Sequence, residues 1–163
     1  MPPYREQSLN SLAAWVKVED MHDCLVCRII RKEEPVGLIY EDADTVVFPF
    51  MFPLTEGHVI VAPKQHFADI FEADPESLAK MMAVVRAVSR KMRLALGINA
   101  ANLINNSGQT AGQDVFHFHM HVIPRRPADQ LNLKEWWLSK ARAADRKQLD
   151  DLRAKLEFGR LEP

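Results

Sequence analysis

The stretch "VFHFHMHVIPRR", residues 115–126, decides the prediction of both fold and function, because it holds three of the chain's six histidines at alternating positions. Side chains at every second position of a β-strand share a face. A strand over Val115–Ile123 therefore places His117, His119 and His121 side by side. The opposite face is the expected core side and carries Phe116, Phe118, Met120 and Val122.

The residues alone leave three interpretations of this histidine face open. The first is an exposed polar face that happens to be rich in histidine. The second is a metal-chelating strand, since imidazoles two residues apart can share an ion. The third is chemistry on a phosphate anion, in which one neutral imidazole is the nucleophile and its neighbours donate to phosphate oxygens. The glycines and amide side chains of the preceding "LINNSGQTAGQD" favour the third interpretation.

Upstream segments predict a sheet around this strand. The stretch "GLIYEDADTVVFPF" indicates two short strands, Gly37–Tyr40 and Thr45–Phe50, about an Asp-rich turn. A β-branched strand is expected over His58–Ala62, within "GHVIVAPKQH", and a further strand in "ANLINN", residues 101–106. Strands outnumber helices and no regular βαβ alternation appears, so the predicted fold class is α+β with a largely antiparallel sheet.

The strongest helix signal is "DPESLAKMMAVVRAVSRKMRLALG", residues 74–97. Asp74 suits the N-cap, Pro75 the first helical position and Gly97 the stop. The helical spacing predicts one buried stripe, comprising Leu78, Met81, Met82, Val85, Val88, Met92 and Leu96. The tail "LKEWWLSKARAADRKQLDDLRAKLEF" predicts one or two more helices, with Leu149, Leu152 and Leu156 on a shared stripe.

Composition indicates an ordinary globular protein. The chain has 163 residues, 47% of them hydrophobic and 26% charged, with a formal net charge of -1. Nothing in the total charge suggests a nucleic-acid partner or a membrane surface, and no apolar run approaches the roughly 18 residues of a membrane span. The first twenty residues do not resemble a secretory signal, so the expected location is the cytoplasm.

Both cysteines of the chain lie together in "CLVC", as Cys24 and Cys27. A redox pair is one interpretation, but the preceding strand and βαβ context that it requires are missing. Two unpaired structural cysteines are a second interpretation. A tetrahedral zinc site is the third, and it needs two further ligands, which His66 and His117 could supply. The sequence separations alone do not establish such a site.

The motif "HFHMHVI" resembles the signature of the histidine triad (HIT) family. The resemblance extends through "GHVIVAPKQH" and "LINNSGQTAGQDV" and covers roughly Asp23 to Arg125. Within the family, the chain is most similar to the bacterial Hint-like branch that carries a CxxC pair. The resemblance implies a five-stranded antiparallel sheet with one long helix, plus C-terminal helices, in a homodimer.

This resemblance also suggests a domain organisation. Residues 1–22 form an N-terminal arm, with a short helix expected from Ser11 to Val18. Residues 23–126 form the HIT domain. Residues 127–163 form a C-terminal helical extension that is expected to pack on the same domain.

The resemblance implies a reaction as well. Family members act as nucleotidyl hydrolases or transferases on a nucleoside phosphoramidate or phosphoanhydride, through a covalent nucleotidyl-histidine intermediate. Carried over by position, His119 is the nucleophile, His121 contacts the phosphate and His58 approaches from the neighbouring strand. The implied substrate-binding residues are Asn106, Gly112, Gln113 and Asp114.

The resemblance assigns the CxxC pair to a metal. The implied structural zinc ligands are Cys24, Cys27, His66 and His117. No redox cofactor is expected, and His22, beside the pair, is expected to be a surface residue. The implied partners are a small nucleotide substrate and a second copy of the chain, with neither a membrane nor a nucleic acid.

Two positions depart from the family pattern. Phe50 stands eight residues before His58, where nucleotide-hydrolysing relatives carry an Asp or Asn that holds the ribose hydroxyls, and a phenyl ring cannot accept those hydrogen bonds. Asp114 replaces the Ser or Thr that contacts the leaving group, and a carboxylate there repels a phosphate. The missing ribose acceptor keeps open one alternative, a zinc-stabilised nucleotide- or partner-binding module with little or no catalysis. A further alternative is a metal-handling protein in which the triad itself binds an exchangeable ion.

Overall fold

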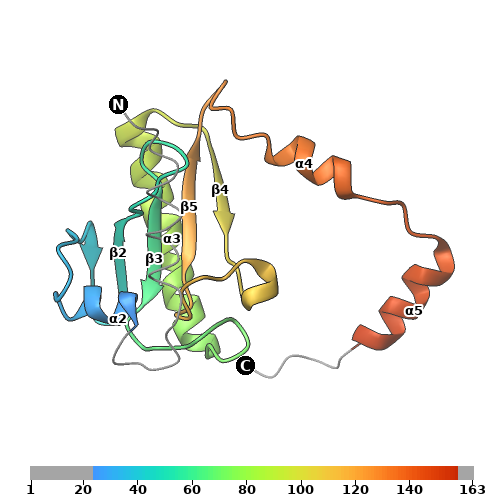
Figure 1. Cartoon of the computed structure of the whole chain (residues 1–163), viewed down its shortest axis with the longest axis horizontal. Helices are drawn as coiled ribbons and strands as arrows, with labels where there is room; N and C mark the ends of the chain where they lie inside the picture. Colours follow the sequence, from blue (N-terminus) through green and yellow to red (C-terminus); the bar gives the residue numbers. More distant parts are fainter. Residues whose placement is uncertain (1–23, 158–163) are drawn as a thin grey trace, which may run out of the picture. The chain divides into compact units, whose positions relative to one another are not determined.

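The computed structural model describes residues 24–157, and the chain divides into two compact units, Met1–Asp129 and Gln130–Pro163. The first unit contains a five-stranded sheet in which all neighbouring strands are antiparallel. In spatial order the strands are β1 (Tyr40–Glu41), β2 (Thr45–Pro49), β3 (Val59–Pro63), β5 (Met120–Arg125) and β4 (Ala100–Ile104) (Figure 1). The predicted α+β class with an antiparallel sheet is confirmed.

The long helix α3 (Pro75–Leu96) begins and ends where its local signals predict. The side chain of Asp74 accepts a hydrogen bond from the backbone N–H of Ser77, which satisfies a free donor of the first turn. Gly97 ends the helix at a left-handed φ of 65°, which favours glycine. The prediction that Met82 is buried is wrong, since 42% of it is exposed, whereas the buried residues are Met81, Val84, Val85 and Met92.

Residues of the strands β2 and β3 are buried on both faces of the sheet, because each face is covered there. On one face, α3 packs in a hydrophobic cluster whose strand residues are Val47, Val59, Val61 and Val122. On the other face, the short helix α2 (Leu25–Ile30) packs in a second cluster whose strand residues are Val46, Phe48, Ile60 and Ala62. His121 pairs with Ile60 in the β3–β5 register and therefore lies on the α2 face.

The predicted strand over Val115–Ile123 is wrong in its first half, because β5 begins only at Met120. Upstream of it the backbone N–H of His117 donates to the carbonyl of Val115, and that of Phe118 donates to the carbonyl of Phe67. These bonds turn the chain away from the sheet ladder. As a result Phe116 is 37% exposed and the prediction of a core position is wrong. The predicted core side is confirmed for the other three residues, Phe118, Met120 and Val122, which pack in the α3 cluster.

The Asp-rich turn between the first two strands is confirmed. One carboxylate oxygen of Asp42 accepts from the backbone N–H groups of Asp44 and Thr45. The first strand is shorter than predicted and starts at Tyr40. No helix within residues 24–157 is long and apolar enough to cross a membrane.

The second unit contains α4 (Leu133–Lys140) and α5 (Arg146–Leu156), so of the one or two helices predicted for the tail there are two. A capping box starts α5, because Asp145 and Gln148 each accept from the other's backbone N–H. That these helices pack on the first unit stays a prediction. The helix expected over residues 11–18 lies outside the described residues.

Candidate active site

The side chain of His119 has its tautomer fixed by a backbone carbonyl. Its Nδ1 lies 2.7 Å from the carbonyl oxygen of His117. A carbonyl oxygen can only accept, so Nδ1 carries the ring proton and Nε2 keeps its lone pair. The ring lines a cavity, and Nε2 is the nitrogen left for a ligand there. His119 therefore offers an unprotonated nitrogen to the cavity.

Hydrogen bonds also fix the tautomers of two further imidazoles, those of His58 and His121. The backbone N–H of Leu54 donates to Nδ1 of His58 at 3.2 Å, so the proton of the neutral ring is on Nε2. That Nε2 donates to Nδ1 of His121 at 3.0 Å, which leaves the proton of His121 on its own Nε2. The His121 ring also lines the cavity, with its centroid 5.0 Å from that of His119. The site thus pairs an acceptor on His119 with a donor on His121.

Burial keeps these rings neutral. Desolvation lowers the pKa of His58 to about 4. Desolvation, together with the neighbouring His119 and His58, lowers the pKa of His121 to about 3. The pKa of His119 is lowered by burial as well, against the opposing effects of the His117 carbonyl and the Asp114 carboxylate. A neutral ring at pH 7 is the form that both the nucleophile and the donor pair require.

The neutral pair makes stability depend on pH. The imidazoles of His58 and His121 have a pKa of about 6.5 in the unfolded chain, so below that pH the unfolded state binds protons that the native state does not. The free energy of unfolding therefore has its full value above pH about 6.5. It falls as the pH drops toward 4, by about 1 kcal/mol per pH unit for each ring. Urea unfolding across this range measures the slope. The variant His121→Asn is expected to give a shallower slope, and an equal slope would contradict the assignment.

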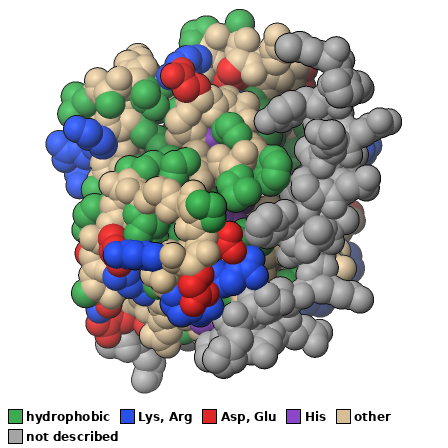
Figure 2. Space-filling view, turned by 60° about the vertical axis from the view of Figure 1, so that its left-hand side comes forward, with side chains coloured by type: hydrophobic (Ala, Val, Ile, Leu, Met, Phe, Trp, Pro, Cys, Tyr) green, Lys and Arg blue, Asp and Glu red, His purple; other side chains and the backbone are tan. Residues whose placement is uncertain are grey.

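The cavity that these histidines line has a volume of about 310 Å³. Of the described residues that line it, none is Lys or Arg, and Asp114 is the one acidic residue. Figure 2 shows small areas of histidine surface between hydrophobic side chains. A ligand in this cavity would therefore meet imidazole, amide and backbone groups, and no cationic side chain of the described residues.

The predicted substrate-binding residues all line the same cavity, but they differ in what their polar atoms do. The amide of Asn106 donates to the Gly112 carbonyl at 3.3 Å and is exposed. Gly112 has a φ of 85°, which an L side chain rarely adopts. Asp114 is exposed at the cavity wall.

The Gln113 side chain, in contrast, is buried and bonded within the protein. Its amide nitrogen donates to the carbonyls of Ala68 and Val115, at 2.6 and 3.1 Å, and its oxygen accepts from the N–H of Gly108 at 2.6 Å. Gln113 therefore holds the loop of residues 108–115 against the segment that follows His66.

One positioning residue has no signal in the sequence pattern. The amide of Asn105 donates to the backbone carbonyl of His119 at 2.9 Å, and its oxygen accepts from the Ser107 hydroxyl at 2.7 Å. Asn105 and Asn106 both follow β4, and their different roles depend on the direction of the chain beyond the strand, which residue types alone do not give.

The second cluster of chemistry-bearing residues comprises Cys24, Cys27, His66 and His117, whose ligand atoms all lie within 4.8 Å of one another. The Sγ···Nδ1 distances are 3.5 Å for Cys24–His117, 3.4 Å for Cys27–His66 and 3.5 Å for Cys27–His117. Zinc bonds of about 2.3 Å to sulfur and 2.0–2.1 Å to nitrogen, at a tetrahedral angle, separate S and N by about 3.5 Å. The four side chains fit a zinc ion.

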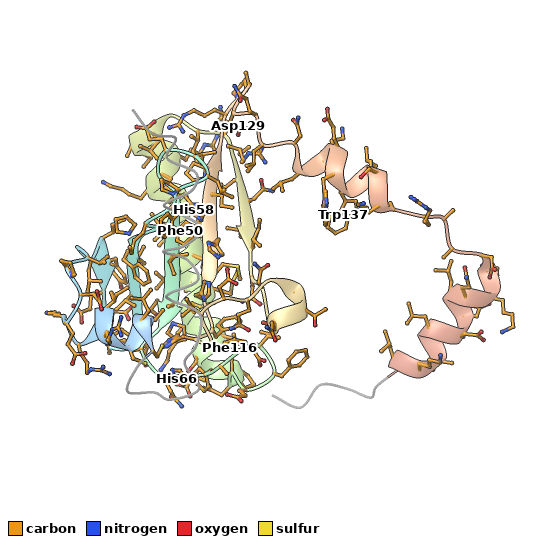
Figure 3. The ribbon with its side chains drawn as sticks, in the orientation of Figure 1. Phe50, His58, His66, Phe116, Asp129 and Trp137 are labelled. Carbon is orange, nitrogen blue, oxygen red and sulfur yellow. The ribbon has the colours of Figure 1, made fainter. Side chains whose placement is uncertain are left out.

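The chemistry of these donors also fits a metal. The Nε2 atom of His117 donates to the Pro63 carbonyl at 2.9 Å, which leaves Nδ1 unprotonated toward the cysteines. Burial and the neighbouring Cys24 raise the pKa of the Cys27 thiol to about 12, so a thiolate pair at this place needs a cation. His58 and His66 flank β3 at its two ends, so the metal cluster lies apart from the His58–His121 pair (Figure 3).

Comparison with known proteins gives consistent matches. A family model described as the HIT domain matches residues 31–128. An uncharacterised HIT-like protein of Mycobacterium tuberculosis is 38% identical over 110 residues, which cover 68% of this chain and 76% of that protein. The adenylylsulfatase HINT3 of Arabidopsis thaliana is also 38% identical over 110 residues, 68% of this chain but 56% of that protein. The crystal structure of a Zn-bound histidine triad family protein from Mycobacterium smegmatis matches with a TM-score of 0.66 and 34% identity, covering 84% of this chain and 97% of the other.

Proposed function

Because this chain belongs to the HIT domain family, we propose that it is a nucleotidyl hydrolase or transferase with His119 as its nucleophile. The substrate is a nucleoside phosphoramidate or phosphoanhydride, attacked at the α-phosphate. The single observation that carries this proposal is the 2.7 Å contact of His119 Nδ1 with a carbonyl, since it leaves Nε2 unprotonated at the cavity.

The first chemical step forms a bond between His119 Nε2 and phosphorus and breaks the bond from phosphorus to the leaving group. The leaving group departs with the bonding electron pair and takes up a proton. The imidazole then carries a positive charge, which the carbonyl of His117 stabilises through Nδ1–H. The Nε2–H of His121 donates to a phosphate oxygen and stabilises the charge that develops there.

Water completes the reaction. Its oxygen attacks phosphorus, the N–P bond breaks, and the electron pair returns to His119 Nε2 as the water proton is released. Another acceptor in place of water gives a transferase. Gln113 and Asn105 position the loop and the nucleophile through the bonds described above.

A substrate panel tests this function against the binding alternative. Purified protein is incubated with adenosine 5′-phosphoramidate, adenylyl sulfate and a dinucleoside polyphosphate, and the release of AMP is measured by chromatography. The proposal expects turnover of at least one of them. Nucleotide binding by calorimetry without any turnover would support a zinc-stabilised binding module instead.

Zinc in this proposal is structural. Four protein ligands close the tetrahedron, so the ion supplies cohesion between α2 and the segments that carry His66 and His117, and no open position for water. The backbone carbonyl of His117 orients His119, so a ring fixed by the metal also fixes the nucleophile. Reduced thiol ligands suit the cytoplasm, where we place the protein.

We also propose a homodimer through β4. This strand pairs with β5 on one side, and no other strand within residues 24–157 pairs with its outer edge. Leu103 on β4 is 47% exposed and lines a groove together with Met82 of α3. An exposed apolar edge strand is a template for pairing with another chain, and a two-fold axis lets two copies pair in the same way.

A charge at the edge strand is expected to separate the dimer. Leu103→Glu places two carboxylates near the proposed two-fold axis, so the mass measured by light scattering is expected to fall from two chains to one. The matched control is Ile39→Glu, an exposed residue next to β1 at the opposite edge, which should remain dimeric. A dimeric Leu103→Glu protein, or a monomeric wild type, would overturn this interface.

A further inference from the structure

The walls of the active-site cavity are divided by polarity. Its polar side chains belong to the three histidines His58, His119 and His121 and to the loop of residues 106–114. The other lining side chains are apolar and include Leu25, Ile29, Phe48, Phe50, Met51 and Phe52. A phosphate fits the polar groups, and whatever is attached to that phosphate must lie against the apolar side chains.

Phe50 lies where the polar and the apolar side chains of the cavity meet. Its ring centroid is 4.6 Å from that of His58 and 5.1 Å from that of His121, and Figure 3 shows it beside His58. Its backbone N–H donates to the carbonyl of His58 at 3.0 Å, which continues the pairing of β2 with β3 and fixes the residue. The group next to the phosphate therefore meets a phenyl ring held in place by the sheet.

The polar groups near Phe50 have little capacity left for a sugar. Both ring nitrogens of His58 are bonded within the protein, to Leu54 N–H and to His121. The remaining proton of His121 and the free nitrogen of His119 face the phosphate in the proposed reaction. A sugar hydroxyl placed against this wall would lose its hydrogen bonds to water without replacement, which disfavours its binding there.

We propose that Phe50 makes this an active site for phosphate derivatives whose organic group is held by aromatic and apolar contact, without hydrogen bonds to sugar hydroxyls. The inference rests on the proposed function, and it assigns Phe50 the role of a specificity-determining residue. The enzyme consequently does not discriminate in favour of a ribose diol, and it accepts substrates that lack the diol at least as well.

A comparison of two substrates that differ only in the diol tests the proposal. Adenosine 5′-phosphoramidate and its 2′,3′-dideoxy analogue are assayed with the same wild-type preparation. The ratio of kcat/KM, ribose over dideoxy, is expected to be about 1 or lower. A ratio of about 10 or more in favour of ribose would overturn the proposal, because it corresponds to a site that binds the hydroxyls.

A polar side chain at position 50 is expected to create a preference for the ribose. Phe50→Asn places an amide beside the sugar, so the ribose-over-dideoxy ratio is expected to rise at least about 10-fold over wild type. The matched control Phe50→Leu opens similar space without a polar atom and should leave the ratio within about 3-fold of the wild-type ratio. An unchanged ratio in an active Phe50→Asn, or an equal rise in Phe50→Leu, would contradict the role of Phe50.

The ratio is measured within each protein, so a general loss of activity cancels. If Phe50→Asn is inactive, the wild-type ratio decides alone. The inference and the function beneath it fail in different ways. If neither substrate releases its nucleoside monophosphate, AMP or 2′,3′-dideoxy-AMP, the proposed reaction on adenosine phosphoramidates is refuted, and this inference with it. Release of AMP with strong ribose preference would refute this inference only.

Discussion

Replacing His119 with alanine is expected to lower kcat at least about 10⁴-fold, because no other cavity-lining side chain within residues 24–157 has a free unprotonated ring nitrogen. Nucleotide binding should survive, since the cavity wall and the His58–His121 pair remain. Single-turnover kinetics and calorimetry on the same preparation separate the two effects. Retained turnover in His119→Ala would end the assignment of the nucleophile.

A milder change distinguishes the nucleophile from its neighbour. His121→Asn keeps a hydrogen-bond donor near the phosphate, so a smaller loss of about 10²-fold is expected. His119→Asn keeps ring-like size and polarity but no nucleophilic nitrogen, and should be as inactive as His119→Ala. Equal losses in His119→Asn and His121→Asn would indicate that neither ring attacks phosphorus in preference to the other.

The second large effect is expected from the metal cluster. Cys27→Ser removes one of the four proposed zinc ligands, so the protein should lose the proposed zinc and its melting temperature should fall by at least about 10 °C, because a bound ion would join α2 to the rest of the first unit. Activity should fall as well, since His117 carries the carbonyl that orients His119. Elemental analysis and calorimetry measure the two effects on the same sample.

His22→Ala is the matched control for the metal, because this histidine neighbours the cysteine pair in the sequence but is not a proposed ligand. It should keep one zinc per chain and the wild-type melting temperature. Zinc retained in Cys27→Ser, or lost in His22→Ala, would show that the ligand set is different. If wild type binds one zinc per chain and His119→Ala still binds it, then His119 is not a metal ligand.

The parts of the fold that the sequence predicts are those with local signals. Helix α3 is bounded by Asp74 and Gly97, and each acts on backbone groups within its own turn. The prediction that Met82 is buried is wrong because the spacing of apolar residues along a helix does not show where the buried stripe ends against the sheet. The packing of α3 across the sheet decides that Val84 is buried in its place.

The active-site segment shows where local patterns fail. Alternation predicts one strand through Val115–Ile123, but His117 donates to Pro63, 54 residues away in the sequence, and lies beside Cys24, 93 residues away. Because of these contacts with distant residues, the segment before Met120 does not pair with the neighbouring strands of the sheet. Gln113 is similar, since its amide bonds to the carbonyl of Ala68, 45 residues away, which no residue pattern shows.

The family resemblance supplied what spacing could not. Residue types alone left the CxxC pair open between redox, structural and metal roles, and the resemblance named His66 and His117 as the two missing ligands. The fold brings all four side chains to the separations that a tetrahedral zinc requires. The apolar cavity wall, by comparison, follows from α2 packing beside β2 and β3, and only Phe50 within it stood out in the sequence.

Mass spectrometry of the acid-sensitive intermediate tests the central claim most directly. The protein is mixed with adenosine 5′-phosphoramidate, quenched in base within milliseconds, digested and mapped. We expect one adenylyl group per chain, bonded to His119, which appears before AMP and decays as AMP forms. An adduct on His121 or His58, or sustained turnover with no adduct at any quench time, would contradict an unprotonated Nε2 of His119 as the atom that attacks phosphorus.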